Sequence, residues 1–354
     1  MTDRAAPEVS AVIAVRNEEA FLRETVPLIL GQDYSGEIEF LFVEGRSDDA
    51  SRELLEELAG SEARVEVLDN PKMHLASALN VGLRRARGDY VVQMDAHTYY
   101  PENYVSTGVE RLRRGDVAWV TGPPVPHGVN PWSRRVALAL DSWLGTGGAR
   151  KWSSRLALIA ARDGTAEIEL DSTSVFAGFW PRSLLEELGG WDESLPVNHD
   201  VELAARVRKT GGKIVCVADL GSRYVPRGSL AGLARQYYGY GYYRVLTSGR
   251  HPEALRRSQL LSPAIVLILA AAAVGPRFLR RPARAVLAAY AAATLATSAA
   301  ALREASPGDA VGLPAVFATM HFSWGIGFLV ACAEHGPPVE AIARAAGRPP
   351  GEPE

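Results

Sequence analysis

The sequence has 354 residues, a formal net charge of −3 and a pI of about 6.2. A chain of this length is expected to form two or more folding units. The balanced charge gives no electrostatic reason to expect nucleic acid as a partner. Cys216 and Cys332 are the only cysteines, which excludes a disulfide scaffold and a cysteine zinc site. The polar residues 1–10 show no secretory signal.

The first hundred residues alternate between predicted strands and predicted helices. Strands are expected at 9–15, 38–44, 65–68 and 90–94, and helices at 17–30, 51–58 and 74–86. Ser47 is expected to cap the second helix. This alternation predicts an α/β fold with a parallel sheet covered by helices on both faces. Ligands bind such sheets at the carboxyl ends of the strands, where Glu44 and Asp95 stand.

The pattern weakens between residues 121 and 164, where loops over a site are expected, with one helix at 133–143. Helices are predicted again at 184–188 and 201–209, and a strand at 214–217. The tail from residue 335 is rich in proline, glycine and charge, so it is predicted to be disordered.

The most informative motif is Asp95-Ala96-His97 at the end of a predicted strand. Side chains two apart on an extended chain point the same way, so one divalent ion can meet both Asp95 and His97. A nucleotide diphosphate needs such an ion, and Mg²⁺ or Mn²⁺ prefers a carboxylate plus phosphate oxygens and waters. Taken alone, Asp95 is equally well explained as the cap of the turn before Pro101.

Two further carboxylates stand at the ends of predicted elements. Glu44 precedes a glycine and can accept hydrogen bonds from a base or a ribose, whereas Ser47 and Asp48 are better explained as helix caps. Asp200 lies at a predicted helix start, where the helix dipole favours its ionised form, the form that a general base requires. Simple N-capping explains Asp200 as well.

The segment 235–244 combines arginines with five tyrosines. Such side chains can stack on sugars and pair with phosphate. An amphipathic helix at a membrane surface has the same composition, and both explanations can hold together.

Three apolar runs follow, at 260–275, 285–302 and 311–333. The first is short for a bilayer span, and the other two approach span length. The arginines after the first run favour a re-entrant first helix, with the second run crossing outward and the third returning, so that Ser306 lies outside. Three ordinary spans, or a soluble Ala-rich helical domain, remain as alternatives.

Seven pieces of the sequence, taken in order over residues 9–245, resemble family 2 glycosyltransferases with the GT-A fold. More narrowly, they resemble the succinoglycan-type exopolysaccharide glycosyltransferases. The matching pieces span 12–19, 43–48, 78–82, 88–92, 95–97, 189–193 and 200–203. The sequence departs from the family where Glu44 replaces a more usual Asp and where His199 precedes Asp200 in place of an acid. Gln236 does not open the signature of processive synthases.

The resemblance implies a Rossmann-like nucleotide-diphospho-sugar transferase domain that carries out inverting transfer with Mg²⁺ or Mn²⁺. It implies Asp200 as the base and Asp95 and His97 as metal ligands. The residues that it implies as contacts of the nucleotide sugar are Val15, Asn17, Glu18, Glu44, Asp95 and Arg244. Those that it implies as contacts of the acceptor or of a phosphate are Arg235, Gln236 and Tyr240.

The expected organisation is a GT-A catalytic domain at 1–250, a membrane-associated helical segment at 251–334 and a disordered tail at 335–354. The expected partners are a nucleotide-sugar donor, with a UDP-sugar as the expected donor, a lipid-linked or glycan acceptor, and the cell (inner or plasma) membrane. The catalytic domain is expected to be cytoplasmic. A non-catalytic scaffold on the same fold and a nucleotidyltransferase are the alternatives. A scaffold is expected to lack Asp95 or Asp200, and a nucleotidyltransferase to carry a Gly-rich basic loop after the first strand, where Val15-Arg16-Asn17-Glu18 stands.

Overall fold

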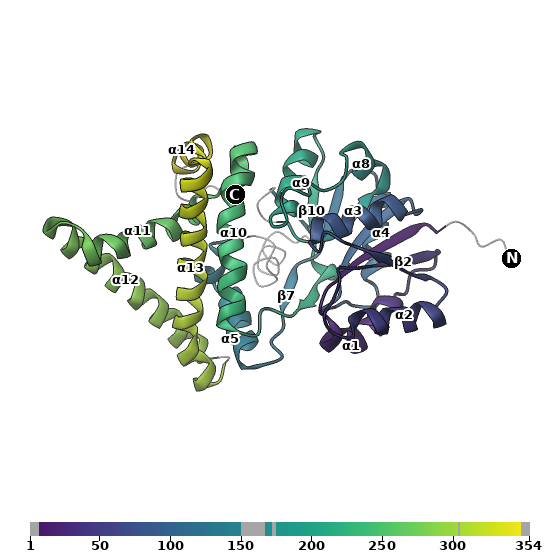
Figure 1. Cartoon of the computed structure of the whole chain (residues 1–354), viewed down its shortest axis with the longest axis horizontal. Helices are drawn as coiled ribbons and strands as arrows, with labels where there is room; N and C mark the ends of the chain where they lie inside the picture. Colours follow the sequence, from purple (N-terminus) through teal and green to yellow (C-terminus); the bar gives the residue numbers. More distant parts are fainter. Residues whose placement is uncertain (1–6, 150–166, 172–174, 304, 348–354) are drawn as a thin grey trace. The chain divides into compact units, whose positions relative to one another are not determined.

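The computed structural model describes residues 7–149, 167–171, 175–303 and 305–347 (Figure 1). The chain divides into two compact units. The first comprises Met1–Val125 and Ser153–Tyr224, and the second comprises Pro126–Trp152 and Val225–Glu354. The packing therefore places residues 225–250 with the C-terminal helices, whereas the predicted catalytic domain runs to residue 250.

The first unit is built on a sheet that has eight strands among the described residues, in the order β3-β2-β1-β4-β9-β6-β10-β8. The first four in this order pair in parallel, and β9 runs antiparallel to β4 and β6. The strands are β1 Val9–Val15, β2 Ile38–Glu44, β3 Val65–Asp69, β4 Tyr90–Asp95, β6 Trp119–Thr121, β8 Glu167–Glu169, β9 Gly178–Pro181 and β10 Ile214–Val217.

Helices cover this sheet, and a small second sheet stands beside it. The helices are α1 Glu19–Leu30, α2 Ser51–Ser61, α3 Leu75–Arg85, α4 Tyr104–Arg113, α8 Arg182–Glu187 and α9 His199–Lys209. The second sheet has the order β5-β11-β7, with β5 Thr98–Tyr99, β11 Ser222–Tyr224 and β7 Pro124–Pro126.

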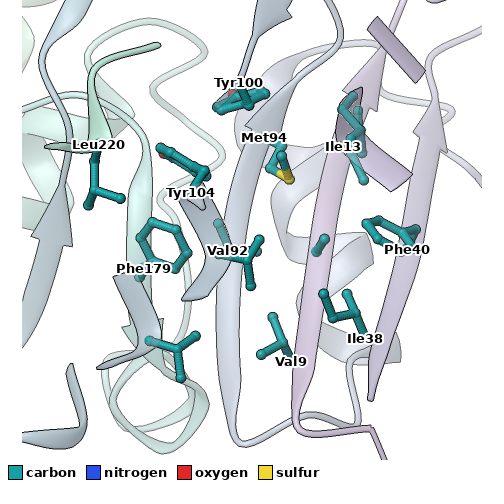
Figure 2. Close-up of a cluster of buried hydrophobic side chains, with 14 of the residues drawn as sticks. Val9, Ile13, Ile38, Phe40, Val92, Met94, Tyr100, Tyr104, Phe179 and Leu220 are labelled. Carbon is teal, nitrogen blue, oxygen red and sulfur yellow. The ribbon is translucent and has the colours of Figure 1, made fainter. Parts of the chain in front are cut away.

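The core of the first unit lies along the central strands. Figure 2 shows Ile13, Phe40, Val92 and Phe179 projecting from neighbouring strands into one apolar cluster. Strands buried on both faces read as continuous apolar runs, and β1 and β2 are buried along almost their whole length. The four predicted N-terminal strands and their helices are therefore confirmed.

One local prediction is wrong, and one strand was missed. The second helix begins at Ser51 after Ala50, and Ser47 does not cap it. Instead, the Ser47 hydroxyl accepts a hydrogen bond from the Asn17 backbone, because two loops meet there. The antiparallel strand β9 was not predicted, because its glycine and proline weaken the sequence signal of a strand.

The second unit is helical among its described residues. Its helices are α5 Pro131–Leu140, α6 Trp143–Thr146, α10 Leu230–Arg250, α11 Leu261–Val274, α12 Arg277–Ala301, α13 Pro307–His335 and α14 Val339–Gly347. Within this unit α13 runs alongside α10, and α11 crosses α13 (Figure 1). Residues 257–274, 277–301 and 307–335 are long and apolar enough to cross a membrane.

The predicted disorder of residues 335–354 is wrong over α14. Ala341 and Ala345 lie on one face of this helix and are buried in a cluster with Val245, Leu255 and Phe328. A short amphipathic helix can form in a tail rich in proline and glycine when its apolar face finds a partner. Residues 348–354 lie outside the described part of the chain.

The close packing of α10 on α13 predicts that the stability of the fold is sensitive to substitution at one glycine of α10 and not at another. A Cβ atom at Gly241 would lie 1.9 Å from the Trp324 carbonyl oxygen, whereas a Cβ atom at Gly249 meets nothing within 4 Å. We expect Gly241→Ala to destabilise the fold by about 1–3 kcal/mol, as overpacking does. Gly249→Ala should be neutral or stabilise by up to about 1 kcal/mol. Thermal unfolding of the purified protein in detergent measures both, and equal midpoints would contradict this packing.

Candidate functional site at the carboxyl edge of the sheet

The candidate site lies where the strand order reverses. β1 has β2 on one side and β4 on the other, with Val15 level with Glu44 and Ala14 level with Asp95. The chain leaves β1 toward β2 and β3 and returns to β4 on the opposite side. The loops after β1 and β4 therefore diverge, and ligands of open α/β sheets bind in the crevice at such a switch point.

A hydrogen bond joins these two loops. The Nδ1 atom of His97, after β4, lies 3.0 Å from a carboxylate oxygen of Glu18, after β1. The rings of Phe21 and Tyr224 flank His97, each with a centroid separation of 6.1 Å. A carboxylate on one ring nitrogen sets the tautomer and directs the other nitrogen toward a ligand. Glu18 therefore orients His97 so that Nε2 is the atom through which it can bind a cation.

Asp95 ends β4 and is held in place by its neighbours. Its backbone N–H donates to the Tyr100 hydroxyl over 2.7 Å, and its carboxylate accepts from the Gln93 amide over 3.2 Å. Burial and the adjacent Asp95 charge raise the pKa of Tyr100 well above its usual range. Tyr100 therefore stays a neutral hydroxyl and adds no charge beside Asp95.

The donor set of this edge fits a hard divalent cation. Asp95 supplies a carboxylate and His97 an imidazole, and no cluster of three or more His, Cys, Asp or Glu suited to a metal occurs within residues 7–149, 167–171, 175–303 and 305–347. Mg²⁺ and Mn²⁺ sites commonly use one or two protein ligands and take the rest from phosphate and water. This edge can therefore hold Mg²⁺ or Mn²⁺ together with a diphosphate.

Hydrogen bonds from side chains join the loops after β1 and β2. Asn17 donates its backbone N–H to the Ser47 hydroxyl over 3.0 Å, and its side-chain oxygen accepts from the Asp48 N–H over 2.8 Å. The Glu18 N–H donates to the Ser51 hydroxyl over 2.8 Å. Asn17 has a φ of 56°, a left-handed conformation that asparagine tolerates better than most residues. These contacts fix the backbone on which Glu18 stands.

Glu44 is buried at the end of β2 and has partners for both oxygens. One accepts from the Ser47 N–H over 2.6 Å and the other from Arg52 over 3.2 Å. Each carboxylate oxygen has a second lone pair, so a contact to a nucleotide stays a prediction. Val15 is buried in the core, and its carbonyl accepts from the Gly45 N–H over 2.9 Å. At Val15, the backbone rather than the side chain lies at this edge.

Asp200 stands in the first turn of α9, and its predicted place at a helix start is confirmed. Its carboxylate is half-buried and accepts from the Val201 N–H over 2.8 Å. The adjacent His199 is buried, and this burial lowers its pKa, although the charges of Asp200 and Asp95 oppose the shift. The charges of Asp95, the last residue of β4, and of Asp200 on α9 therefore both act on His199.

Two of the family-like pieces, 78–82 and 189–193, are hydrogen-bonded to each other. The Asn80 side chain on α3 donates to the Trp191 carbonyl over 2.8 Å and to the Glu193 carboxylate over 3.0 Å, and it accepts from the Trp191 N–H over 2.9 Å. Arg206 pairs with Glu202 and donates to the Gly190 carbonyl over 2.8 Å. These pieces build the frame that carries α9, and with it Asp200.

The remaining predicted residues lie on α10 in the second unit. Arg235 is exposed, and the Gln236 amide donates to the Tyr240 hydroxyl over 3.0 Å. Arg244 is buried and donates to the Ala254 carbonyl over 2.8 Å. Arg244 thus holds α10 to the turn that follows it. Contacts of Arg235, Gln236, Tyr240 and Arg244 with a donor or an acceptor stay predictions.

Sequence reasoning missed four residues that shape the site. Tyr100 lies three residues after His97, so its nearness to the motif was a usable signal. Phe21, Tyr224 and Arg52 carry no local signal, because only the fold brings them to His97 and Glu44.

Comparison with known proteins identifies the domain. The family model "Glycosyl transferase family 2" matches residues 10–184. Succinoglycan biosynthesis protein ExoA of Rhizobium meliloti (strain 1021) is 29% identical over 230 residues, which is 64% of this chain and 66% of that protein. A Methanococcus voltae protein is 23% identical over 241 residues, 66% of this chain and 71% of its own length. It is named dolichyl N-acetyl-alpha-D-glucosaminyl phosphate 3-beta-D-2,3-diacetamido-2,3-dideoxy-beta-D-glucuronosyltransferase. The matches thus span about two thirds of these relatives.

Solved structures show the same fold. The mannosyltransferase PcManGT from Pyrobaculum calidifontis, in complex with GDP-Man and Mn²⁺, superposes with a TM-score of 0.58 at 21% identity, covering 92% of this chain and 90% of that one. S. aureus TarS 1–349 in complex with UDP gives a TM-score of 0.50 at 13% identity, covering 93% and 92%. With the family match and the switch-point site, these comparisons show that the chain carries a glycosyltransferase family 2 domain on a GT-A-like fold.

Proposed function

We propose that this enzyme transfers a sugar from a nucleoside diphosphate sugar, a UDP-sugar, to a membrane-associated or lipid-linked acceptor in glycan or exopolysaccharide synthesis. The observation that carries the proposal is the pairing of Asp95 with a His97 held by Glu18 at the switch point. The names of the relatives, one in succinoglycan biosynthesis and one acting on a dolichyl phosphate sugar, support the acceptor class.

The donor would lie along the edge formed by the loops after β1, β2 and β4. Asp95 and His97 would hold Mg²⁺ or Mn²⁺, which when bound offsets the charge of the diphosphate. Glu44 and the backbone at Val15 and Asn17 lie at the ends of β2 and β1, where the nucleoside would be held. Glu18 would act by positioning His97 rather than by touching the nucleotide.

Asp200 would act as the general base. Its carboxylate would take the proton of the acceptor hydroxyl while that oxygen forms a bond to the anomeric carbon. The bond from this carbon to the diphosphate oxygen breaks, and the nucleotide leaves with the electron pair. Attack opposite the leaving group inverts the anomeric configuration. Placement at the start of α9 favours the ionised carboxylate that this step needs.

The acceptor would approach from the membrane. The second unit carries helices apolar enough to enter lipid, and Arg235, Gln236 and Tyr240 on α10 would face the acceptor or its phosphate. The catalytic unit would lie on the cytoplasmic side of the cell membrane.

Removal of the cation should abolish turnover. We expect EDTA to stop release of nucleotide from the donor and Mn²⁺ or Mg²⁺ to restore it. Asp95→Asn should lower turnover by about 100-fold or more, because a bound cation supplies several kcal/mol to the transition state. Asp33→Asn, an exposed carboxylate on a loop, is the control and should behave as the parent. Full activity of the metal-free protein would refute the role of Asp95 and His97.

Replacement of the base should slow the chemistry and leave donor binding intact. Asp200→Asn keeps the shape of the side chain and removes its proton affinity, so turnover should fall by about 10²–10⁴-fold. Titration calorimetry with the nucleotide should give an unchanged Kd. Asp219→Asn, on an exposed turn, controls for the loss of one charge. If Asp200→Asn turns over at nearly the parental rate, another residue is the base.

A further inference from the structure

By length and composition α13 is a candidate membrane span, yet its neighbours in the structure are protein. The helix lies in the middle of the second unit and contacts α5, α10, α11 and α12. A helix that is apolar all round is either a membrane span or a helix buried in a protein core, and hydropathy does not distinguish them. Buried side chains occur along its length, at Asp309, Leu313, Phe317, Met320, Trp324, Phe328 and Ala331.

The first turn of α13 is tied to α5. The Asp309 carboxylate lies 3.5 Å from Arg134 and 3.4 Å from Arg135. Only four residues separate α5 from β7, which belongs to the small sheet beside the nucleotide-binding core. Four residues extend about 14 Å at most, and the hydrocarbon core of a bilayer is about 30 Å thick. The turn before α13 is therefore on the same side of a membrane as the catalytic unit.

The middle of α13 is held by polar groups of α6 and α12. The Nε2 atom of His321 lies 3.0 Å from the Leu144 carbonyl on α6, which begins two residues after the C-cap of α5. The Nδ1 atom of His321 lies 2.9 Å from the Tyr290 hydroxyl on α12. The one imidazole in the middle of α13 thus has protein partners for both of its nitrogen atoms.

The second half of α13 packs along α10. A Cβ atom at Gly327 would lie 2.1 Å from the Tyr238 carbonyl, and the Tyr242 hydroxyl donates to Glu334 over 2.6 Å. α10 carries an exposed Arg235, and five residues separate it from β11. A helix with such charge is costly to place beside lipid chains. A membrane-crossing α13 would take α10 into the hydrocarbon with it.

We propose that α13 is the core helix of the second unit and does not cross the membrane, and that only the α11–α12 hairpin enters lipid, from the catalytic side. α11 and residues 285–301 of α12 contain no charged residue. Large apolar side chains are exposed on this hairpin, including Leu261, Val274 and Leu295 at 63%, 81% and 60%. Lipid hydrocarbon is the partner that fits a long, uncharged and exposed surface of this kind.

This arrangement replaces the topology expected from hydropathy and charge, in which Ser306 lies on the far side. In Figure 1 α11 lies at an angle to α13 rather than alongside it, and the proposal assigns the two helices different roles. The inference concerns attachment rather than chemistry, so it stands or falls independently of the proposed reaction.

Single cysteines and a membrane-impermeant thiol reagent test the proposal. Cys332→Ala removes the partly exposed thiol, and the buried Cys216 gives the background. Three exposed positions then receive one cysteine each: Ser61→Cys on α2 as the catalytic-side reference, Ser306→Cys before α13, and Ala343→Cys on α14. Labelling is compared between intact cells and inverted membrane vesicles.

All three positions should label from one and the same side. Label at 306 and 343 from opposite sides would show that α13 crosses and would overturn the proposal. Label at both 306 and 343 from the side opposite to 61 would overturn the proposal as well. A thiol at 306 or 343 that reacts only after denaturation would also overturn it, because that position would then lie in the lipid. Since the readout needs no turnover, it separates this proposal from a failure of the proposed reaction.

Discussion

The hydrogen bond between His97 and Glu18 is the interaction on which the rest of the site depends. β1 and β4 are neighbours whose following loops diverge, and this contact is made across the divergence. It sets the orientation of the His97 ring, two residues after Asp95 at the edge of the sheet. Phe21 and Tyr224 pack against His97 and keep its ring in place.

Much of the remaining polar structure supports this edge indirectly. Asn17 and Ser47 bind the loops after β1 and β2 to each other, and Glu44 holds the second of these loops through its own carboxylate. On α3, the Asn80 side chain is hydrogen-bonded to the backbone of Trp191, in the segment that precedes α9 and its Asp200. Pieces that lie far apart along the chain thus support one another in the fold.

The sequence predicted what depends on local pattern and missed what depends on tertiary contact. The apolar runs of β1 and β2 and the placement of Asp95 and Asp200 at element ends follow from periodicity and capping. Two interpretations failed for a shared reason. Ser47 has the sequence features of a helix cap, but a second loop approaches it and takes its hydroxyl, and the tail that contains α14 reads as disordered, but Ala341 finds a buried partner surface. Composition specifies how apolar a surface is, but only packing shows what covers it.

The most direct test of the central claim is the affinity for Mn²⁺ in the presence of UDP, measured by electron paramagnetic resonance on two neighbouring isosteric variants. Glu18→Gln removes the negative charge beside Nδ1 of His97, whereas Glu19→Gln removes the same charge one residue away and leaves the contacts of His97 unchanged. The account predicts that Glu18→Gln weakens Mn²⁺ binding by about 10–100-fold, as the loss of such a supporting partner does, and that Glu19→Gln binds as the parent does. Equal affinities for Glu18→Gln and the parent would contradict it.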